Sequence, residues 1–191
     1  MFRLPLAADL AARLPAKGDA ERLFALIDAD RAHLGARLDW VDGTRGPDDV
    51  RTFLEGSLAN FAAGRGFDAL LEADGAPVGM LGVHDVHARP ARAAVGYWLA
   101  SARQGEGLIT RAVAGLLPHL FGAMELERVE IRCDPANARS RAVPERLGFT
   151  NEGTLRRVER VGDRSIDHVV YGLLRDEWRA GPDRGPEETP A

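Results

Sequence analysis

The stretch VGYWLASARQGEGLITR at residues 95–111 begins as an apolar strand and ends at the start of a helix. Between these two parts lies a turn that contains Gly105 and Gly107. A helix N-terminus presents several free backbone amides and the positive end of the helix dipole at one point, and glycine lets a ligand approach the backbone closely. Thr110 and Arg111 can add a hydroxyl and a charge. The stretch therefore predicts a turn that suits a pyrophosphate.

Two common phosphate-binding motifs do not fit this turn. A nucleotide P-loop carries Gly-Lys followed by Ser or Thr, and no such run occurs in this sequence. A dinucleotide fingerprint has a third glycine at the position that Thr110 occupies. A plain turn is the other interpretation of a glycine pair, so the neighbouring sequence has to decide between a turn and a ligand site.

The composition describes an ordinary globular domain. The chain has 191 residues, of which 45% are hydrophobic and 28% are charged, as is typical of soluble proteins. This length suits one domain. Cys133 is the only cysteine, so neither an internal disulfide nor a Cys-x-x-Cys pair can form. The histidines show no metal-ligand spacing, and we expect no metal.

Charge and hydropathy argue against two classes of partner. The 25 basic and 29 acidic residues give a net charge of −4, without the basic stripe that nonspecific nucleic-acid binding needs. No apolar run reaches the ~18 residues of a membrane span, and Pro5, Asp9 and Arg13 interrupt the N-terminal apolar residues. We therefore expect a cytoplasmic protein that binds neither DNA nor a membrane.

Four segments show the three- and four-residue spacing of a buried helix face. The expected helices cover residues 19–27, 47–61, 108–121 and 138–147. Pro118 removes an amide donor from the third and predicts an end or a kink there. Pro144 is equally unfavourable in the fourth, which ends at Gly148 in the left-handed position. Residues 34–45 are expected to form a polar connection between the first two helices.

Six segments have the apolar patterns of strands. They cover residues 67–72, 78–83, 93–99, 128–133, 154–160 and 166–173. Asp74-Gly75 predicts a hairpin turn between the first two, and residues 161–164 predict another between the last two. The element order, which also begins with a strand before the first helix, predicts one mixed α/β domain over residues 1–178. Residues 179–191 have almost no apolar anchor, so we expect a flexible tail.

Further motifs accompany the glycine-rich turn. They are Gly96-Tyr97-Trp98-Leu99, Gln104-Gly105-x-Gly107-Leu108, Arg128-Val129-Glu130-Ile131-Arg132-Cys133, Asn137-x-x-Ser140 and Leu147-Gly148-Phe149. Together they resemble the GNAT acyl-CoA-dependent N-acetyltransferases, and among these the RimJ/RimL branch, which acetylates the N-termini of ribosomal proteins. The resemblance extends from about Leu14 to Trp178. It implies a GNAT fold, in which a mixed, largely antiparallel sheet with flanking helices is splayed between two parallel strands, here residues 93–99 and 128–133.

The resemblance also implies a binding site for acetyl-CoA, the acyl donor. The residues implied to bind it are Trp98, Leu99, Gln104, Gly105, Glu106, Gly107, Leu108, Ile109, Thr110 and Asn137. The amides of the turn would bind the pyrophosphate, and the main chain at Trp98 and Leu99 would pair with the pantetheine arm in the splay. Asn137 would hydrogen-bond the cofactor near its thioester.

Two residues are implied to catalyse the transfer. Ser140 would donate a proton to the departing thiolate, and Glu159 would act as the general base. Direct transfer needs a neutral amine, an acceptor for its proton, a polarised carbonyl and a stabilised thiolate. An α-amine has a reference pKa of ~8, against ~10.4 for lysine, so a carboxylate deprotonates an N-terminus more readily than a lysine.

The sequence departs from the family pattern at three positions. Ile109 replaces the last small residue of the turn motif, a change that this branch commonly allows. Glu106 stands where relatives carry a basic or neutral residue, and its charge would weaken CoA binding unless the side chain points to solvent. Ala94 stands where relatives often carry a glutamate, which makes Glu159 more necessary as the base.

Three further side chains are candidates for the substrate site, and each has a structural alternative. Trp40 would line the acceptor pocket or simply pack near the first two helices. His84, which follows a strand, would touch the substrate or remain a surface group. Tyr97 would contribute to the substrate site or to the core and cofactor wall. Cys133 is expected to be a small buried residue of its strand.

These observations predict transfer of an acetyl group from acetyl-CoA to a primary amine. The favoured acceptor is the N-terminal α-amine of a protein, such as a ribosomal protein. A small amine, such as a polyamine or an antibiotic, and a larger donor, such as succinyl-CoA, are alternatives. A noncatalytic acyl-CoA-binding module is the alternative of another class. Relatives in the family often pair, so a homodimer is also expected.

Overall fold

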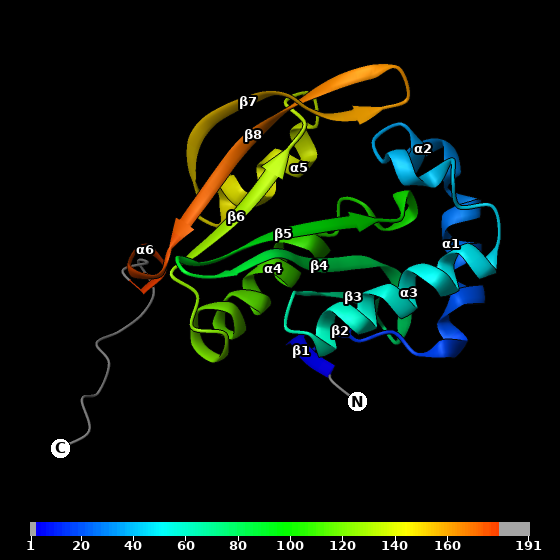
Figure 1. Cartoon of the computed structure of the whole chain (residues 1–191). Helices are drawn as coiled ribbons and strands as arrows, with labels where there is room; N and C mark the ends of the chain where they lie inside the picture. The colour runs from blue at the N-terminus through cyan, green and yellow to red at the C-terminus, as the bar shows by residue number, and fades with distance from the viewer. Residues whose placement is uncertain (1–2, 180–191) are drawn as a thin grey trace.

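Eight strands form one sheet in the computed structural model, which describes residues 3–179 (Figure 1). Their order across the sheet is β1-β2-β3-β4-β5-β6-β8-β7. The strands are β1 (Arg3–Ala7), β2 (Leu10–Arg13), β3 (Phe67–Ala73), β4 (Ala76–Ala88), β5 (Ala91–Leu99), β6 (Arg128–Cys133), β7 (Thr150–Val161) and β8 (Arg164–Leu174). All neighbouring pairs are antiparallel except β5 and β6, which are parallel. The expected mixed, largely antiparallel sheet is confirmed.

Helices cover both faces of the sheet. They are α1 (Ala20–Ala29), α2 (Arg31–Gly35), α3 (Pro47–Ala62), α4 (Leu108–Pro118), α5 (Ala138–Arg146) and α6 (Arg175–Arg179). Neighbouring residues of a strand point to opposite faces, and β3 shows this directly. Leu70 belongs to the core under α1 and α3, whereas Leu71 belongs to the larger core under α4. The four helices and six strands expected from the sequence all form.

The two parallel strands diverge along their length. β5 and β6 pair at Arg92–Arg128, Ala93–Val129 and Ala94–Glu130. β5 then continues to Leu99 and β6 to Cys133 without further pairing between them. Their facing backbone groups can therefore hydrogen-bond a ligand that enters the gap. The splay that the resemblance implied is confirmed.

The β7–β8 hairpin lies at the edge of the sheet and reaches across to α2 (Figure 1). Its register shifts twice, between Asn151 and Gly153 and between Leu155 and Glu159. Such bulges bend and twist a strand. At the tip of the hairpin, Arg164 Nη2 donates a hydrogen bond to the carbonyl oxygen of Ala36 at 2.8 Å. The hairpin and the chain that follows α2 therefore face one another.

The sequence did not predict the short helices that lie between and after the main elements. Residues 34–45 include the end of α2 and a 3-10 turn at Asp39–Val41, whose Val41 is fully buried. A five-residue helix is too short to show a helical period. The final helix α6 was also missed, and it contains Arg179, which we expected to begin the tail. Residues 180–191 of that expected tail lie outside the described residues.

Pro118 ends α4, as its missing amide predicts. The chain continues as a π-helical turn at His119–Ala123. Within residues 3–179, no helix is long and apolar enough to cross a membrane.

Candidate active site

A large cavity opens beside the splay. It has a volume of about 1030 Å³ and is lined by α2, the end of β5, the turn before α4, and α5. This volume is at the upper end of small-molecule pockets. Among the predicted site residues, it is lined by Tyr97, Trp98, Leu99, Gln104, Gly105, Gly107, Leu108, Ile109, Thr110, Asn137 and Ser140. The predicted site residues outside its lining are Trp40, His84, Glu106 and Glu159.

The turn before α4 leaves room for a ligand at the helix N-terminus. Gly105 and Gly107 have φ angles of 86° and 69°, a region that favours glycine. Gly107 is the N-cap of α4, and no described side chain caps that helix. A Cβ atom on either glycine would meet no described atom within 4 Å. The first amides of α4 can therefore bind an anionic group.

The Gln104 side chain contacts both α2 and α5, which line the cavity. Its Nε2 atom lies 2.8 Å from Nε2 of His33 on α2. Its Oε1 atom accepts a hydrogen bond from Arg139 on α5. The sequence suggested only a main-chain role for Gln104. The side-chain contacts were not predictable, because His33 and Arg139 lie on elements far away in the sequence.

Arginines give the cavity positive charge. Arg139 and Arg146 on α5 line it, and neither forms an ion pair with a carboxylate of the described residues. Arg111, which the sequence indicated as a charge for the phosphate, also lines it but pairs with Asp9 at 2.6 Å. The two α5 arginines were missed, because arginines are frequent along this chain and the sequence does not show which of them face inward.

Glu106 does not line the cavity. Its carboxylate accepts hydrogen bonds from Arg103 at 2.8 and 2.9 Å. The Arg103 guanidinium lowers the pKa of the Glu106 carboxyl below its usual range, so Glu106 stays ionised and paired. Arg103 also lies 3.3 Å from Asp74. The Glu106 charge that we expected to oppose the pyrophosphate is therefore paired with Arg103, which it shares with Asp74.

Asn137 and Ser140 are positioned by the first turn of α5. The Asn137 Oδ1 atom accepts a hydrogen bond from the backbone amide of Ser140 at 3.2 Å, which caps the helix. The Asn137 Nδ2 group has no hydrogen-bond partner among residues 3–179, so it can donate to a ligand in the cavity. The Ser140 hydroxyl lies 3.2 Å from the Cys133 sulfur and 3.4 Å from the Tyr97 oxygen.

Tyr97 compensates for the proline inside α5. Pro144 has no amide hydrogen, so the carbonyl of Ser140, four residues earlier, loses its helical donor. The Tyr97 hydroxyl donates a hydrogen bond to this carbonyl at 3.1 Å. The unfavourable proline therefore has a structural consequence, because it fixes Ser140 to the splayed end of β5.

Burial keeps the neighbours of Ser140 protonated. It raises the pKa of the Tyr97 phenol far above the usual value, and it raises the pKa of the Cys133 thiol as well. Both groups are therefore neutral at neutral pH and hold a proton. The Ser140 hydroxyl lies beside these two neutral groups at the edge of the cavity.

Glu159 forms a pair with His168 on the neighbouring strand. Its Oε2 atom lies 2.7 Å from the His168 Nε2 atom. The Glu159 side chain is 36% exposed and that of His168 is 19% exposed, so the pair is partly shielded from water. His168 was not singled out from the sequence. The bulge between Leu155 and Glu159 sets which residues meet across the hairpin, and a strand pattern does not show a bulge.

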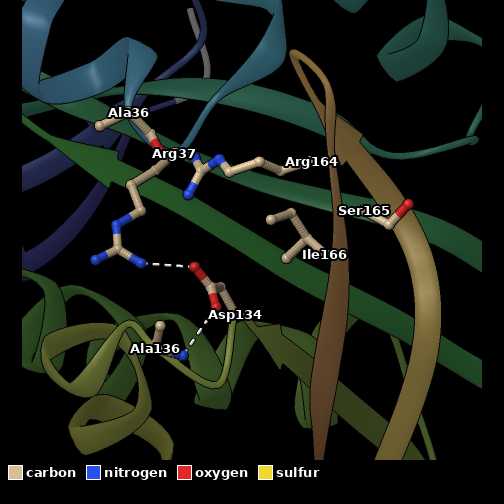
Figure 2. Close-up of a pocket in the computed structure, with 7 residues that line it drawn as sticks. All are labelled: Ala36, Arg37, Asp134, Ala136, Arg164, Ser165 and Ile166. Carbon is tan, nitrogen blue, oxygen red and sulfur yellow. Dashed lines mark hydrogen bonds and ion pairs between the residues drawn. The ribbon is translucent and has the colours of Figure 1, made fainter.

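A second cavity lies between the chain after α2 and the β7–β8 hairpin (Figure 2). It has a volume of about 650 Å³ and is lined by Ala36, Arg37, Asp134, Ala136, Arg164, Ser165 and Ile166. Ala36, Arg37 and Ala136 also line the large cavity, so the two cavities adjoin. At their boundary, Arg37 Nη1 lies 2.6 Å from Asp134 Oδ2.

Trp40 and His84 line neither cavity. Trp40 is 38% exposed, and its ring centroid lies 6.0 Å from that of Trp98 with an interplanar angle of 52°. The His84 Nε2 atom lies 3.3 Å from a carboxylate oxygen of Asp68. Trp40 thus contacts the cavity wall through Trp98, whereas His84 belongs to the surface of β4 outside both cavities.

A buried glutamate also lies at the apex of the splay. Glu130 is the register partner of Ala94, where the family resemblance implied a glutamate. Burial alone would raise the pKa of Glu130, but hydrogen bonds from Arg132 and Arg128 lower it overall. Its carboxylate lies 2.9 Å from Arg132 and 3.0 Å from Arg128. These arginines make Glu130 a weak proton acceptor.

The Acetyltransferase (GNAT) domain family matches residues 9–150, which include the splayed strands, the glycine-rich turn and all of α5. The chain belongs to the GNAT acetyltransferase family. The splayed pair and the uncapped turn both lie inside the matched range.

Similar proteins support the assignment to this family. A putative ribosomal N-acetyltransferase, YdaF of Bacillus subtilis, is 36% identical over 179 residues, which cover 93% of this chain and 98% of the relative. The ribosomal-protein-serine acetyltransferase of Escherichia coli is 27% identical and covers 84% and 90%. The structure of Mycobacterium smegmatis RimJ with a CoA disulfide is similar at a TM-score of 0.83, with 32% identity, covering 92% of this chain and 86% of RimJ.

The GNAT acetyltransferase uses acetyl-CoA as the acyl donor for transfer to an amine, as the sequence predicted. Its large cavity has features that suit this donor. They are uncapped helix amides, two arginines without carboxylate partners in the described chain, and open backbone edges in the splay. Residues 3–179 contain no cluster of three or more residues able to hold a metal ion.

Proposed function

We propose that the enzyme acetylates the N-terminal α-amine of a protein, with the acceptor entering through the second cavity. The observation that carries the proposal is the position of Glu159. Its register partner is Ile166, and Ile166 lines that cavity. The similar proteins from Bacillus subtilis and Escherichia coli, which are named for ribosomal substrates, support the choice of a protein acceptor.

The geometry of the β7–β8 hairpin supports the proposal that the Glu159–His168 pair lies beside the acceptor amine. Ile166 points into the space between Arg164 and Asp134 (Figure 2). Residues i and i+2 of a strand share a face of the sheet, so His168 lies on the same face as Ile166. His168 in turn holds the Glu159 carboxylate. The proposed base therefore lies on the side from which the amine would arrive.

In this proposal the donor lies in the large cavity, with four sets of contacts. The amides at the start of α4 bind the pyrophosphate. Gln104 and the adjacent glycines shape the turn, and the main chain at Trp98 and Leu99 pairs with the pantetheine arm. Asn137 donates through Nδ2 near the thioester. The acetyl group then lies close to the boundary with the second cavity, where both substrates can meet.

The proposed chemistry is one direct transfer. The neutral amine nitrogen attacks the thioester carbonyl and gives up a proton to Glu159, so that a C–N bond forms and the C–S bond breaks. The thiolate that leaves takes a proton from the Ser140 hydroxyl. Ser140 then regains a proton from solvent, and Glu159 releases to solvent the proton that it took. Tyr97 and Cys133 are the neutral groups next to Ser140. A positioned carboxylate suits an α-amine, whose reference pKa of ~8 is well below the ~10.4 of lysine.

Three broader expectations belong to the same proposal. Residues 1–178 form one domain, which the continuous sheet from β1 to β8 supports. The enzyme acts in the cytoplasm and binds neither DNA nor membranes. It forms a homodimer, as the family resemblance implies, and light scattering should then give twice the monomer mass of 20.7 kDa.

The acceptor is tested with a mixed panel. N-terminal peptides, polyamines and aminoglycosides are incubated with the enzyme and acetyl-CoA or succinyl-CoA, and the products are identified by mass spectrometry. The proposal predicts acetylated peptide α-amines. Acetylation of small amines alone would replace the protein acceptor with a small molecule, and a preference for succinyl-CoA would change the donor. No release of CoA thiol with any amine would support a noncatalytic binding module.

A further inference from the structure

The second cavity has an excess of positive charge. Its lining includes two guanidinium groups, Arg37 and Arg164, and one carboxylate, Asp134. The Asp134 carboxylate is fully occupied, because Oδ2 pairs with Arg37 at 2.6 Å and Oδ1 accepts the amide of Ala136 at 2.8 Å. The guanidinium of Arg164 forms no ion pair with a carboxylate anywhere in residues 3–179.

Arg164 is held in place without being neutralised. One of its Nη atoms donates to the carbonyl oxygen of Ala36, a neutral acceptor, at 2.8 Å. Figure 2 shows its side chain reaching across the cavity from the hairpin toward Arg37. The remaining N–H groups of the guanidinium can bind a carboxylate, for which the planar fork of arginine is well matched.

We infer that Arg164, with Arg37 beside it, binds an acidic side chain of the acceptor peptide close to the reacting amine. This inference rests on the proposed peptide acceptor and adds its charge preference. The enzyme should therefore favour N-termini that carry aspartate or glutamate within the first few residues.

The length of β8 indicates where that acidic side chain lies in the peptide. A strand rises about 3.3 Å per residue, so Arg164 and His168 are separated by roughly 13 Å along β8. An extended acceptor has a similar rise, and an arginine side chain shortens the distance that the peptide must cover. With its amine beside the Glu159–His168 pair, the acceptor presents its second to fourth residues to Arg164.

The experiment uses three pairs of short peptides that begin with serine. In each pair, aspartate at position two, three or four is compared with asparagine at the same position. Two quantities are measured for each peptide: kcat/KM for acetyl transfer, and the dissociation constant from the CoA-bound enzyme by calorimetry. Because the binding measurement needs no turnover, a failure of the charge preference is distinguishable from a failure of the proposed reaction.

We expect the wild-type enzyme to favour aspartate at one or more positions by roughly fivefold, the size of a partly exposed ion pair. Arg164→Gln should reduce the ratio between the two peptides to about one, and Arg164→Lys should retain part of the ratio. Arg160→Gln is the matched control. Arg160 carries the same charge on the same hairpin, but its side chain is 72% exposed and pairs with Asp163 instead of lining the cavity.

Each outcome decides the inference. Equal dissociation constants within all three pairs, or a preference that persists in Arg164→Gln, would overturn the acidic subsite. Acetyl transfer without charge preference would retain the proposed function and reject the subsite. Preferential binding of the aspartate peptide through Arg164 without transfer would retain the subsite and reject the proposed function.

Discussion

The hydroxyl of Tyr97 on β5 donates a hydrogen bond to the carbonyl oxygen of Ser140 on α5, at 3.1 Å. This carbonyl would otherwise lack a donor, because the amide four residues later belongs to Pro144. The bond joins the strand that opens the splay to the helix that carries the proposed proton donor. The one carbonyl of α5 that loses its helical donor to Pro144 therefore belongs to Ser140, the residue that the proposed mechanism needs in a fixed position.

This relationship predicts an energetic coupling between Tyr97 and Pro144. Tyr97→Phe should lower the free energy of unfolding by about 1–3 kcal/mol, because the Ser140 carbonyl is left without its donor. In a Pro144→Ala background the loss should be smaller, since the new amide can donate to the same carbonyl. Urea denaturation of the wild type, the two single variants and the double variant measures the coupling.

Tyr171→Phe is the matched control for that cycle. Tyr171 is also a buried tyrosine next to α5, but its hydroxyl contacts the side chains of Glu145 and Arg141 instead of a helix carbonyl. Its effect should not depend on residue 144. Equal losses for Tyr97→Phe in both backgrounds would contradict the compensating role of the Tyr97 hydroxyl.

The glycine-rich turn predicts a loss of acetyl-CoA affinity in Gly107→Val. A side chain there would occupy the space beside the first amides of α4, where the pyrophosphate binds in the proposal. Calorimetry with acetyl-CoA should show weaker binding to a protein that is still folded. Unchanged acetyl-CoA affinity in the folded Gly107→Val variant would contradict the assignment of this turn to cofactor binding.

Gly64→Val controls for backbone strain in that test. Gly64 has a φ of 68°, almost the same as the 69° of Gly107, and also has no atom within 4 Å of an added Cβ. It follows α3 and lines neither cavity. Both variants should lose similar stability, and only Gly107→Val should lose affinity.

The sequence was most informative where the chemistry is local. The glycines at 105 and 107, the alternation of the strands and the helix stripes each depend on neighbours in the chain, and the structure contains all of them. The proline inside α5 also allowed a prediction that we did not make from the sequence. A helix with Pro144 must leave the Ser140 carbonyl without an amide donor, so a donor from elsewhere was predictable even though Tyr97 was not.

The parts of the site that depend on distant segments were not predictable from one sequence. The Glu159–His168 pair depends on a bulge that shifts the β7 register, and strand alternation carries no signal of a bulge. The ion pair between Arg37 and Asp134 joins residues 97 positions apart. The expected role of His84 as a substrate contact also depended on its surroundings, and the structure places it beside Asp68, outside both cavities.

Ser140→Ala should lower kcat more than it changes the dissociation constant of acetyl-CoA. In the proposed mechanism the hydroxyl acts as the C–S bond breaks, and the variant keeps the carbonyl that Tyr97 binds. The loss should be roughly tenfold, below the ~10²-fold of many general acids, because a thiol of reference pKa ~8.5 is already a tolerable leaving group. Steady-state kinetics and calorimetry measure the two quantities, and an unchanged kcat would remove Ser140 from the mechanism.

The central claim is that Glu159 accepts the proton of the amine. Glu159→Gln keeps the size of the side chain and removes its basic carboxylate, so acetyl-CoA affinity should remain nearly intact while kcat/KM falls by ~10²–10⁴-fold at neutral pH. The loss should shrink as the pH approaches the pKa of the amine, because more of the acceptor then arrives neutral. Glu152→Gln, on the same strand but paired with Arg128, is the matched control.

The most direct test measures kcat/KM from pH 6 to 9.5 for the wild type, Glu159→Gln and Glu152→Gln. It uses a confirmed acceptor and saturating acetyl-CoA. The account predicts a large loss for Glu159→Gln alone, greatest at low pH and smaller as the pH rises. A Glu159→Gln profile that matches the wild type throughout would contradict the account, because water or another group would then take the proton.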